Sequence, residues 1–154
     1  MQVWRICRAV HAATAFSGDG AWTYGGRWNP RNVFMAYAAP SRALAAMEFW
    51  VNMDPSTPAP DLRMCSAELP DSKGILQRIK VANLPNDWRG LNNEALKKLG
   101  AEWIESGRSL ALEVPSVVVE GEWNVLLNPA HPDFAKVKIG KPEPFQYDLR
   151  MFGK

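Results

Sequence analysis

The amino-acid sequence predicts a single α+β domain in which a few helices flank short strands. First, 154 residues are enough for one domain with its own core, and 47% hydrophobic and 22% charged residues are ordinary for a folded protein. Second, two segments combine helix start signals with helical apolar spacing. Third, short segments with strand-like alternation or β-branched composition are spread along the whole chain.

In the first half of the chain we expect one helix and three strands, at residues 3–10, 33–38 and 63–69. Ser41 is a suitable N-cap for the helix, which should run to about Asn52. Its inward face is predicted from three apolar residues, Leu44, Met47 and Val51. Residues 12–20 are expected to form a mobile loop. The proline-rich residues 54–61 form a surface connection that is too short to separate two domains.

In the second half, Asn92 or Asn93 is expected to cap a helix that runs through Glu105 and ends at Gly107. Its predicted buried face consists of Leu96, Leu99, Gly100 and Trp103. Glu94 and Lys98 are predicted to pair across one helical turn. Residues 120–129 are expected to turn back, and strands are predicted at residues 109–114, 137–139 and 145–150.

Charge and cysteine content exclude several classes of function. The net charge is only +2, from 18 basic and 16 acidic residues, which gives no electrostatic footprint for duplex nucleic acid. Cys7 and Cys65 match no metal or redox spacing and indicate a reducing environment. The charged N-terminus does not resemble a signal peptide, and no segment has the length of a membrane span. We therefore expect a cytoplasmic protein with no membrane partner, and the two histidines suggest no metal site.

The main candidate for a ligand-binding segment is Tyr24-Gly25-Gly26-Arg27-Trp28-Asn29. Its glycines allow unusual backbone conformations and leave room for a ligand near the main chain. Arg27 offers a planar fork suited to phosphate or carboxylate, Trp28 and Tyr24 offer flat apolar faces, and Asn29 offers a donor and an acceptor. The alternative is a tight turn whose Arg is solvated and whose Trp packs in the core.

Two residues further along add to this candidate site. Tyr37 lies where a predicted strand passes into a helix, a position that suits either a site or the core. Glu48 falls on the predicted apolar face of the first helix, where an unpaired charge is costly. It is therefore either paired with a buried cation or directed into a cavity where its charge is used.

Other polar residues leave alternatives open. Arg5 and Arg8 are either ordinary edge charges or line a site together with Arg27. Ser116 follows Pro115 at a break in the chain, and with no His at a triad spacing it gives no support for a serine nucleophile.

Several motifs of this chain, in this order, resemble the RES-domain family over essentially the whole length, 1–154. They are Trp4-Arg5-Ile6, the Tyr24–Asn29 stretch, Tyr37, Glu48, Leu112-Glu113-Val114-Pro115-Ser116, Asn124-Val125-Leu126-Leu127-Asn128-Pro129, His131-Pro132 and Phe145-Gln146-Tyr147-Asp148-Leu149-Arg150. The Arg, Glu and Ser that give the family its name resemble Arg27, Glu48 and Ser116.

The resemblance implies a fold similar to ADP-ribosyltransferases, with mixed sheets and flanking helices, and the activity of a toxin from a bacterial toxin–antitoxin pair. Such toxins cleave the nicotinamide–ribose bond of NAD+ by hydrolysis or phosphorolysis, so NAD+ is a substrate and not a cofactor. The partner implied is an antitoxin with a helix-turn-helix domain, so DNA would be bound only through that partner.

The same resemblance implies roles for individual residues. Arg27 would hold the pyrophosphate, Tyr37 the nicotinamide, and Glu48 the ribose and its transition-state charge. The remaining substrate-binding positions are expected at Tyr24, Gly26, Trp28, Asn29, Ser116 and Asn128.

Two alternatives to NAD+ cleavage are ADP-ribosylation of a protein target and a non-catalytic module that binds a nucleotide or single-stranded nucleic acid. The module would use Trp28 and Tyr24 as stacking platforms. The near-neutral charge argues against nucleic acid, and Glu48 on an apolar face argues for chemistry.

Overall fold

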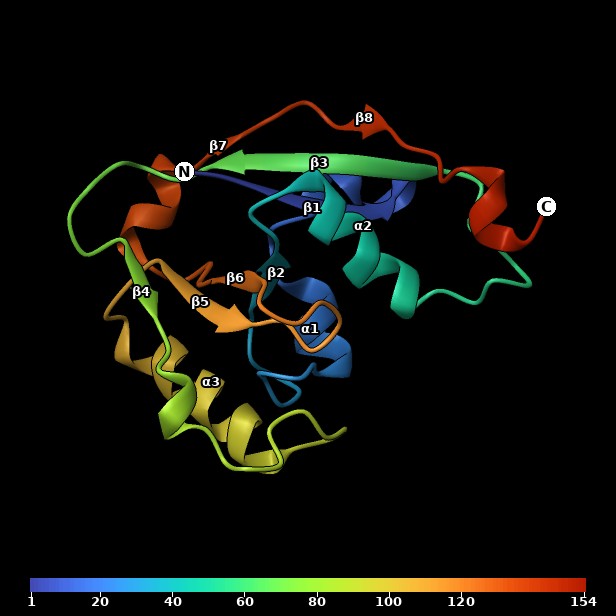
Figure 1. Ribbon diagram of the computed structural model, residues 1–154. Coiled ribbons are helices and arrows are strands. Elements are labelled where there is room, and N and C mark those ends of the chain that lie inside the picture. Colours follow the sequence, from blue (N-terminus) through green and yellow to red (C-terminus); the bar gives the residue numbers. More distant parts are fainter.

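Two four-stranded sheets and three α-helices make up the computed structural model, which describes residues 1–154. The upper sheet of Figure 1 contains β1 (Gln2–Arg8), β3 (Leu62–Glu68), β7 (Lys138–Ile139) and β8 (Glu143–Pro144). The lower sheet has the order β2-β6-β5-β4, formed by β2 (Ala36–Ala38), β6 (Trp123–Leu127), β5 (Ala111–Pro115) and β4 (Leu76–Arg78). The helices are α1 (Asp19–Tyr24), α2 (Arg42–Val51) and α3 (Glu94–Ser106). The predicted α+β fold is confirmed.

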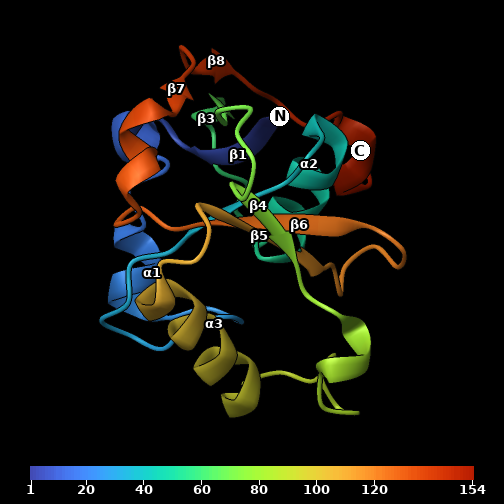
Figure 2. The ribbon, with the colours of Figure 1, turned by 90° about the vertical axis from the view of Figure 1, so that its left-hand side faces the viewer.

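The molecule has three layers, which Figures 1 and 2 show from two directions: the upper sheet, the lower sheet, and α3 beneath it. Strands β1 and β3 are antiparallel along their full length. The lower sheet is mixed, because β4 and β5 are parallel whereas β5–β6 and β2–β6 are antiparallel. Trp4 and Ala39 exchange two backbone hydrogen bonds of 2.8 Å, which fix the end of β2 against β1 and so join the two sheets.

Strand alternation separates the apolar side chains into distinct cores. One core lies between the two sheets and includes Val3, Cys7, Cys65, Val125 and Leu127. A second core lies between the lower sheet and α3 and includes Trp28, Met35, Trp88, Leu96, Trp103, Leu112 and Leu126. A third core packs α2 and the C-terminal segment against Ile6 and Met64 of the upper sheet.

The two larger helices begin where the sequence predicts, because each has a side-chain cap. Ser41 Oγ accepts a hydrogen bond from the Leu44 N–H of α2 at 3.1 Å. Asn93 Oδ1 accepts from the Ala95 and Leu96 N–H groups of α3 at 3.1 and 3.3 Å. Gly107 ends α3 with φ +57°, a left-handed conformation that favours glycine.

The predicted inward face of α2 is wrong in two of its three residues. Met47 is 39% exposed and Val51 is 58% exposed, whereas Leu44 and Ala45 are buried. The reason is tertiary, because the Trp50 ring packs edge-on against Tyr147, with ring centroids 5.1 Å apart, and turns the helix toward the C-terminal segment.

Four further expectations need correction. Residues 12–20 are not simply a loop, because they contain the end of a 3₁₀ helix (Ala9–Thr14) and the start of α1. Residues 120–129 turn back at Glu120 and Gly121 as expected, but they are not only a turn, because they continue as strand β6, which pairs on both sides. Residues 145–150 form no strand; β8 precedes them and a 3₁₀ helix (Leu149–Phe152) follows. Glu94 pairs with Lys97 at 3.5 Å, and Lys98 pairs with Glu102 at 3.9 Å, because side-chain direction favours these neighbours.

None of the helices combines the length and the hydropathy needed to cross a bilayer. Both cysteines are free and buried, with their Sγ atoms 3.6 Å apart between β1 and β3. His131 caps a 3₁₀ helix (Pro132–Lys136) by accepting a hydrogen bond from the Asp133 N–H at Nδ1, as its position between two prolines suggests.

Helix α3 approaches the Trp28 backbone so closely that only glycine fits at position 100. A Cβ on Gly100 would lie 1.7 Å from the Trp28 carbonyl oxygen and 2.8 Å from its carbon. We expect Gly100→Ala to lower the free energy of unfolding by about 3 kcal/mol, because backbone must move to relieve the overlap. Urea denaturation measures this change.

Gly20→Ala is the matched control, since nothing lies within 4 Å of a Cβ at that helical position. It should leave stability unchanged or raise it by about 0.5–1 kcal/mol. Equal losses in both variants would contradict the close packing of α3.

Candidate active site

The Gly25–Asn29 stretch forms a tight turn at the end of α1. Gly25 has φ +72°, and Gly26 and Asn29 form a β-bridge in which the Gly26 N–H donates to the Asn29 carbonyl at 2.9 Å. A Cβ on Gly26 would lie 2.6 Å from the Tyr37 hydroxyl, so the room left by this glycine is taken by Tyr37. The two glycines are thus required by backbone conformation and close packing.

The hydroxyl of Tyr37 fixes this turn to strand β2. It donates to Asn29 Oδ1 at 2.7 Å and accepts from the Trp28 N–H at 2.9 Å. Burial raises the pKa of the Tyr37 phenol above its usual range, although the Trp28 hydrogen bond and the Arg27 and Arg5 charges oppose this shift. The phenol is therefore neutral at pH 7, and its ring is half-buried.

Arg27 is partly tied to a neighbouring loop and partly free. Its Nη1 donates to the carbonyl oxygens of Gly90, Trp88 and Arg89 at 2.8, 3.3 and 3.5 Å. Nε and Nη2 have no hydrogen-bond partner within the chain, and Arg27 belongs to no ion pair. These two donors on one edge of the guanidinium suit a bidentate contact with phosphate.

Glu48 is held by hydrogen bonds and not by a cation. Its Oε1 accepts from Ser116 Oγ at 2.7 Å and from Asn124 Nδ2 at 2.5 Å, and no ion pair includes Glu48. Both bonds go to the same oxygen, so Oε2 has no protein partner. Of the two expectations for Glu48, pairing with a buried cation is wrong.

Ser116 links Glu48 to the turn that follows β5. Its Oγ donates to Glu48 and also accepts from the N–H groups of Val118 and Val119 at 3.1 and 3.0 Å. Ser116 is 2% exposed, and its hydroxyl is fully used. Its role in this geometry is to position Glu48, which is consistent with the absence of a serine–histidine pair in the sequence.

Strand register places Tyr37 on the same face of the lower sheet as Asn124, the hydrogen-bond partner of Glu48. Tyr37 stands opposite Leu126 in the β2–β6 pair, and Asn124 lies two positions from Leu126. Residues two apart on a strand share a face, so Tyr37 and Asn124 are diagonal neighbours, about 7–8 Å apart at Cα. Arg27, Tyr37 and Glu48 therefore belong to one candidate site.

Arg5 adds a second cation to this site. Its Nη1 donates to the Tyr37 carbonyl oxygen at 3.1 Å, and its Nε is buried without a partner. Burial lowers the pKa of the Arg5 guanidinium, but an arginine remains charged at pH 7. A buried donor without a partner is costly, which marks Arg5 as a group that a bound anion would satisfy. Of the two charges left open, Arg8 is an edge charge that pairs with Asp61 at 2.9 Å.

Three residues predicted to bind substrate have their side chains committed to the fold. Trp28 is 2% exposed within the second core, so its ring is not a stacking platform. Asn29 is fully buried and donates to the carbonyls of Ala21, Pro30 and Val33. Asn128 donates to the Ile104 carbonyl and accepts from the Ala130 N–H. By contrast, Tyr24 is 78% exposed at the end of α1.

Asn124 is the site residue that the sequence analysis missed. Residues 120–129 are predicted only to turn back, so the sequence prediction assigns no strand face to Asn124. A polar Asn on the same face as Leu126, in an otherwise apolar strand, is the signal that would have identified it.

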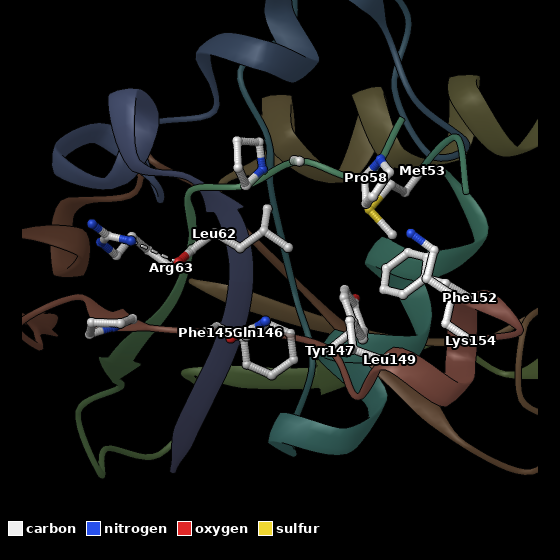
Figure 3. A pocket seen from close by; sticks show the side chains of 13 residues that line it. Met53, Pro58, Leu62, Arg63, Phe145, Gln146, Tyr147, Leu149, Phe152 and Lys154 are labelled. Atoms are coloured by element: carbon white, nitrogen blue, oxygen red, sulfur yellow. Dashed lines mark hydrogen bonds between the residues drawn. The ribbon is translucent and has the colours of Figure 1, made fainter. Parts of the chain in front are cut away.

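A separate groove of about 600 Å³ lies at the C-terminal segment (Figure 3). Its labelled lining residues include Met53, Leu62, Arg63, Phe145 and Tyr147. The groove shares no residue with the candidate site. It reflects the packing of the C-terminal segment, where the Tyr147 hydroxyl donates to the Ala46 carbonyl of α2 at 2.6 Å.

The two hydrogen bonds of the Tyr37 hydroxyl should contribute to the free energy of unfolding. Tyr37→Phe leaves Asn29 Oδ1 and the Trp28 N–H unpaired in a buried setting, so we expect a loss of about 1–3 kcal/mol in the free energy of unfolding. Thermal or urea unfolding measures it. Tyr24→Phe is the control, because the Tyr24 hydroxyl is exposed and unbonded, and it should change stability by less than about 0.5 kcal/mol. A silent Tyr37→Phe would show that the turn is held without this hydroxyl.

Comparison with known proteins identifies the family to which the chain belongs. A family model described as the RES domain matches residues 2–148. A protein named Prs ADP-ribosylating toxin from Sphingobium sp. is 38% identical, over 98% of this chain and 96% of its own length. A protein named Toxin Res from Yersinia enterocolitica is 35% identical over 98% of this chain and 99% of its own length.

Among solved structures, the chain superposes on a chain of the M. tuberculosis MbcT-MbcA toxin-antitoxin complex with a TM-score of 0.72. The match covers 99% of this chain and 86% of that chain at 18% sequence identity, so it supports the fold alone. The family model and the two relatives agree over nearly the whole length. The chain belongs to the RES-domain family.

Proposed function

We propose that this RES-domain protein is a toxin that destroys NAD+ by cleaving its nicotinamide–ribose bond. The observation that carries the proposal is a carboxylate, Glu48, held by two neutral hydrogen bonds on Oε1 with Oε2 free. One of its partners, Asn124, shares a sheet face with Tyr37, whose hydroxyl binds the turn that carries Arg27. The relatives named toxins support the biological role, and the relative named ADP-ribosylating supports chemistry at this bond of NAD+.

The reaction needs charge stabilisation more than proton transfer. When the bond between C1′ of the ribose and the nicotinamide nitrogen breaks, its electron pair leaves with nicotinamide, which becomes neutral. The ribose develops oxocarbenium character, and a nearby carboxylate stabilises this positive charge. Water then adds at C1′, so NAD+ and water give ADP-ribose, nicotinamide and a proton. No general acid is required, which suits a site without histidine.

The remaining residues bind the substrate in this proposal. The free Nε and Nη2 of Arg27 contact the diphosphate, and the unpartnered Nε of Arg5 provides a second contact for negative charge. The half-buried Tyr37 ring stacks on nicotinamide, while its hydroxyl keeps the turn in place. Ser116 and Asn124 orient Glu48 and leave its negative charge uncompensated by any cation.

A second candidate function is transfer of ADP-ribose to a protein, which the name of the Sphingobium relative favours. Both reactions share the bond-breaking step and differ only in the group that attacks C1′. Mass spectrometry of the products separates them, with and without phosphate: free ADP-ribose or its 1-phosphate supports depletion of NAD+, and a modified protein supports transfer. Binding of NAD+ without release of nicotinamide would support the non-catalytic module.

We propose that the protein partner is an antitoxin that covers the Arg27 pocket. The solved relative is a toxin-antitoxin complex, which supports such a partner. A helix-turn-helix domain in the antitoxin would carry DNA binding, in agreement with a net charge of only +2 on this chain.

Glu48→Gln tests the chemistry. The amide oxygen still accepts from Ser116 and Asn124, so stability should change by less than about 1 kcal/mol and NAD+ should still bind. Loss of the negative charge should slow nicotinamide release on the order of a hundredfold or more. The measurements are a nicotinamide-release assay and a thermal melt on one preparation. The control is Glu102→Gln, on the exposed face of α3, which should change neither the rate of nicotinamide release nor the melting temperature. If Glu48→Gln melts at a lower temperature but releases nicotinamide at the normal rate, Glu48 has a structural role only.

Arg27→Lys tests the diphosphate contact. Lysine keeps the charge but loses the planar fork, so the affinity for NAD+ should fall about tenfold. Isothermal titration in the Glu48→Gln background measures binding without turnover. The matched control is Arg31→Lys, at an exposed position whose side chain makes no hydrogen bond or ion pair. Equal affinity for NAD+ in both variants would show that Arg27 is a solvated turn residue that does not contact the substrate.

A further inference from the structure

The segment from Trp88 to Gly90 contacts the Arg27 side of the candidate site and is anchored at one end in the second core. Trp88 is 9% exposed and belongs to the same buried cluster as Trp28. The carbonyls of Trp88, Arg89 and Gly90 all accept from Arg27 Nη1. This side of the segment is therefore joined to the turn that carries Arg27.

A second contact, from Arg89, links the segment to the turn next to Glu48. The Arg89 guanidinium lies over the Trp88 ring, 4.7 Å from its centroid, and its Nη2 is 3.6 Å from Glu120 Oε1. Glu120 belongs to the turn after Ser116, and Ser116 binds both this turn and Glu48. The ion pair thus connects the Arg27 side of the site to the Glu48 side.

We propose that residues Trp88–Gly90 form a strap that orients Arg27 toward the diphosphate of NAD+. The ion pair between Arg89 and Glu120, called the clasp below, holds the strap in place. This inference rests on the proposed function and makes Arg89 a positioning residue. The strap carbonyls bind Nη1 of the Arg27 guanidinium and leave Nε and Nη2 without a partner in the chain. When the clasp is broken, the strap carbonyls no longer hold that orientation, so substrate binding weakens while the chemistry at Glu48 is unchanged.

Charge exchange across the clasp is the test. Arg89→Glu and Glu120→Arg should each raise KM for NAD+, by about fivefold for an exposed ion pair, with kcat held within about twofold. The double variant, with the charges exchanged, should restore KM. High salt should reduce the difference between the single variants and the wild type, because both side chains are exposed. A rise in KM that the exchange does not restore overturns the clasp.

The control is the same exchange at Lys98 and Glu102, an exposed ion pair of 3.9 Å on α3. These variants should leave KM and kcat unchanged. A similar rise in KM there would show that the effect comes from altered surface charge, and would overturn the proposal.

Amide hydrogen exchange gives a readout that does not depend on activity. The Trp88 and Gly90 N–H groups donate to the Pro85 and Asp87 carbonyls, so their exchange reports on the strap. Without NAD+, exchange at residues 88–90 should be faster in Arg89→Glu than in the wild type and unchanged in Lys98→Glu. Unchanged exchange in Arg89→Glu overturns the strap. If the wild type releases no nicotinamide, the proposed function is wrong. Hydrogen exchange at residues 88–90 still shows whether the Arg89–Glu120 ion pair holds the strap.

Discussion

The Tyr37 hydroxyl bonds both to the Trp28 N–H and to Asn29 Oδ1, and the position of the Arg27 turn depends on this junction. Gly26 must lack a side chain because the hydroxyl occupies the space of its Cβ. With the turn fixed, the Trp28 ring enters the second core and its carbonyl lies against Gly100 of α3. One hydroxyl therefore connects the lower sheet, the Arg27 turn and the helical layer.

The electrostatics of the site differ from those of the whole molecule. The chain carries a net charge of only +2. Nevertheless, Arg5, which binds the Tyr37 carbonyl, and Arg27, in the turn that binds the Tyr37 hydroxyl, have no acidic partner, and Glu48 has no basic one. Removing charges from water without pairing them costs free energy, which the surrounding cores must offset. This separation of charge is consistent with the proposed substrate, because NAD+ carries an anionic diphosphate and a cationic nicotinamide ring.

Most of the local structure follows from the sequence. The caps at Ser41 and Asn93, the end of α3 at Gly107, strand β3 and the buried face of Leu96, Gly100 and Trp103 depend on hydrogen bonds and spacing within a few residues. The family motifs also point to Arg27, Tyr37, Glu48 and Ser116. In the structure Ser116 binds Glu48, and the Tyr37 hydroxyl binds the turn that carries Arg27.

Tertiary structure decided what these side chains contact. The Trp28 ring and the Asn29 amide had the right chemistry for a ligand, but the second core and three backbone carbonyls engage them. The face of α2 was set by aromatic residues about a hundred positions away, and Asn124 became a partner of Glu48 only through the pairing of β6 with β2 and β5. Sequence spacing determines which residues share a face of their own element. Contacts between distant elements depend on the packing of the whole chain, so only the folded structure could assign them.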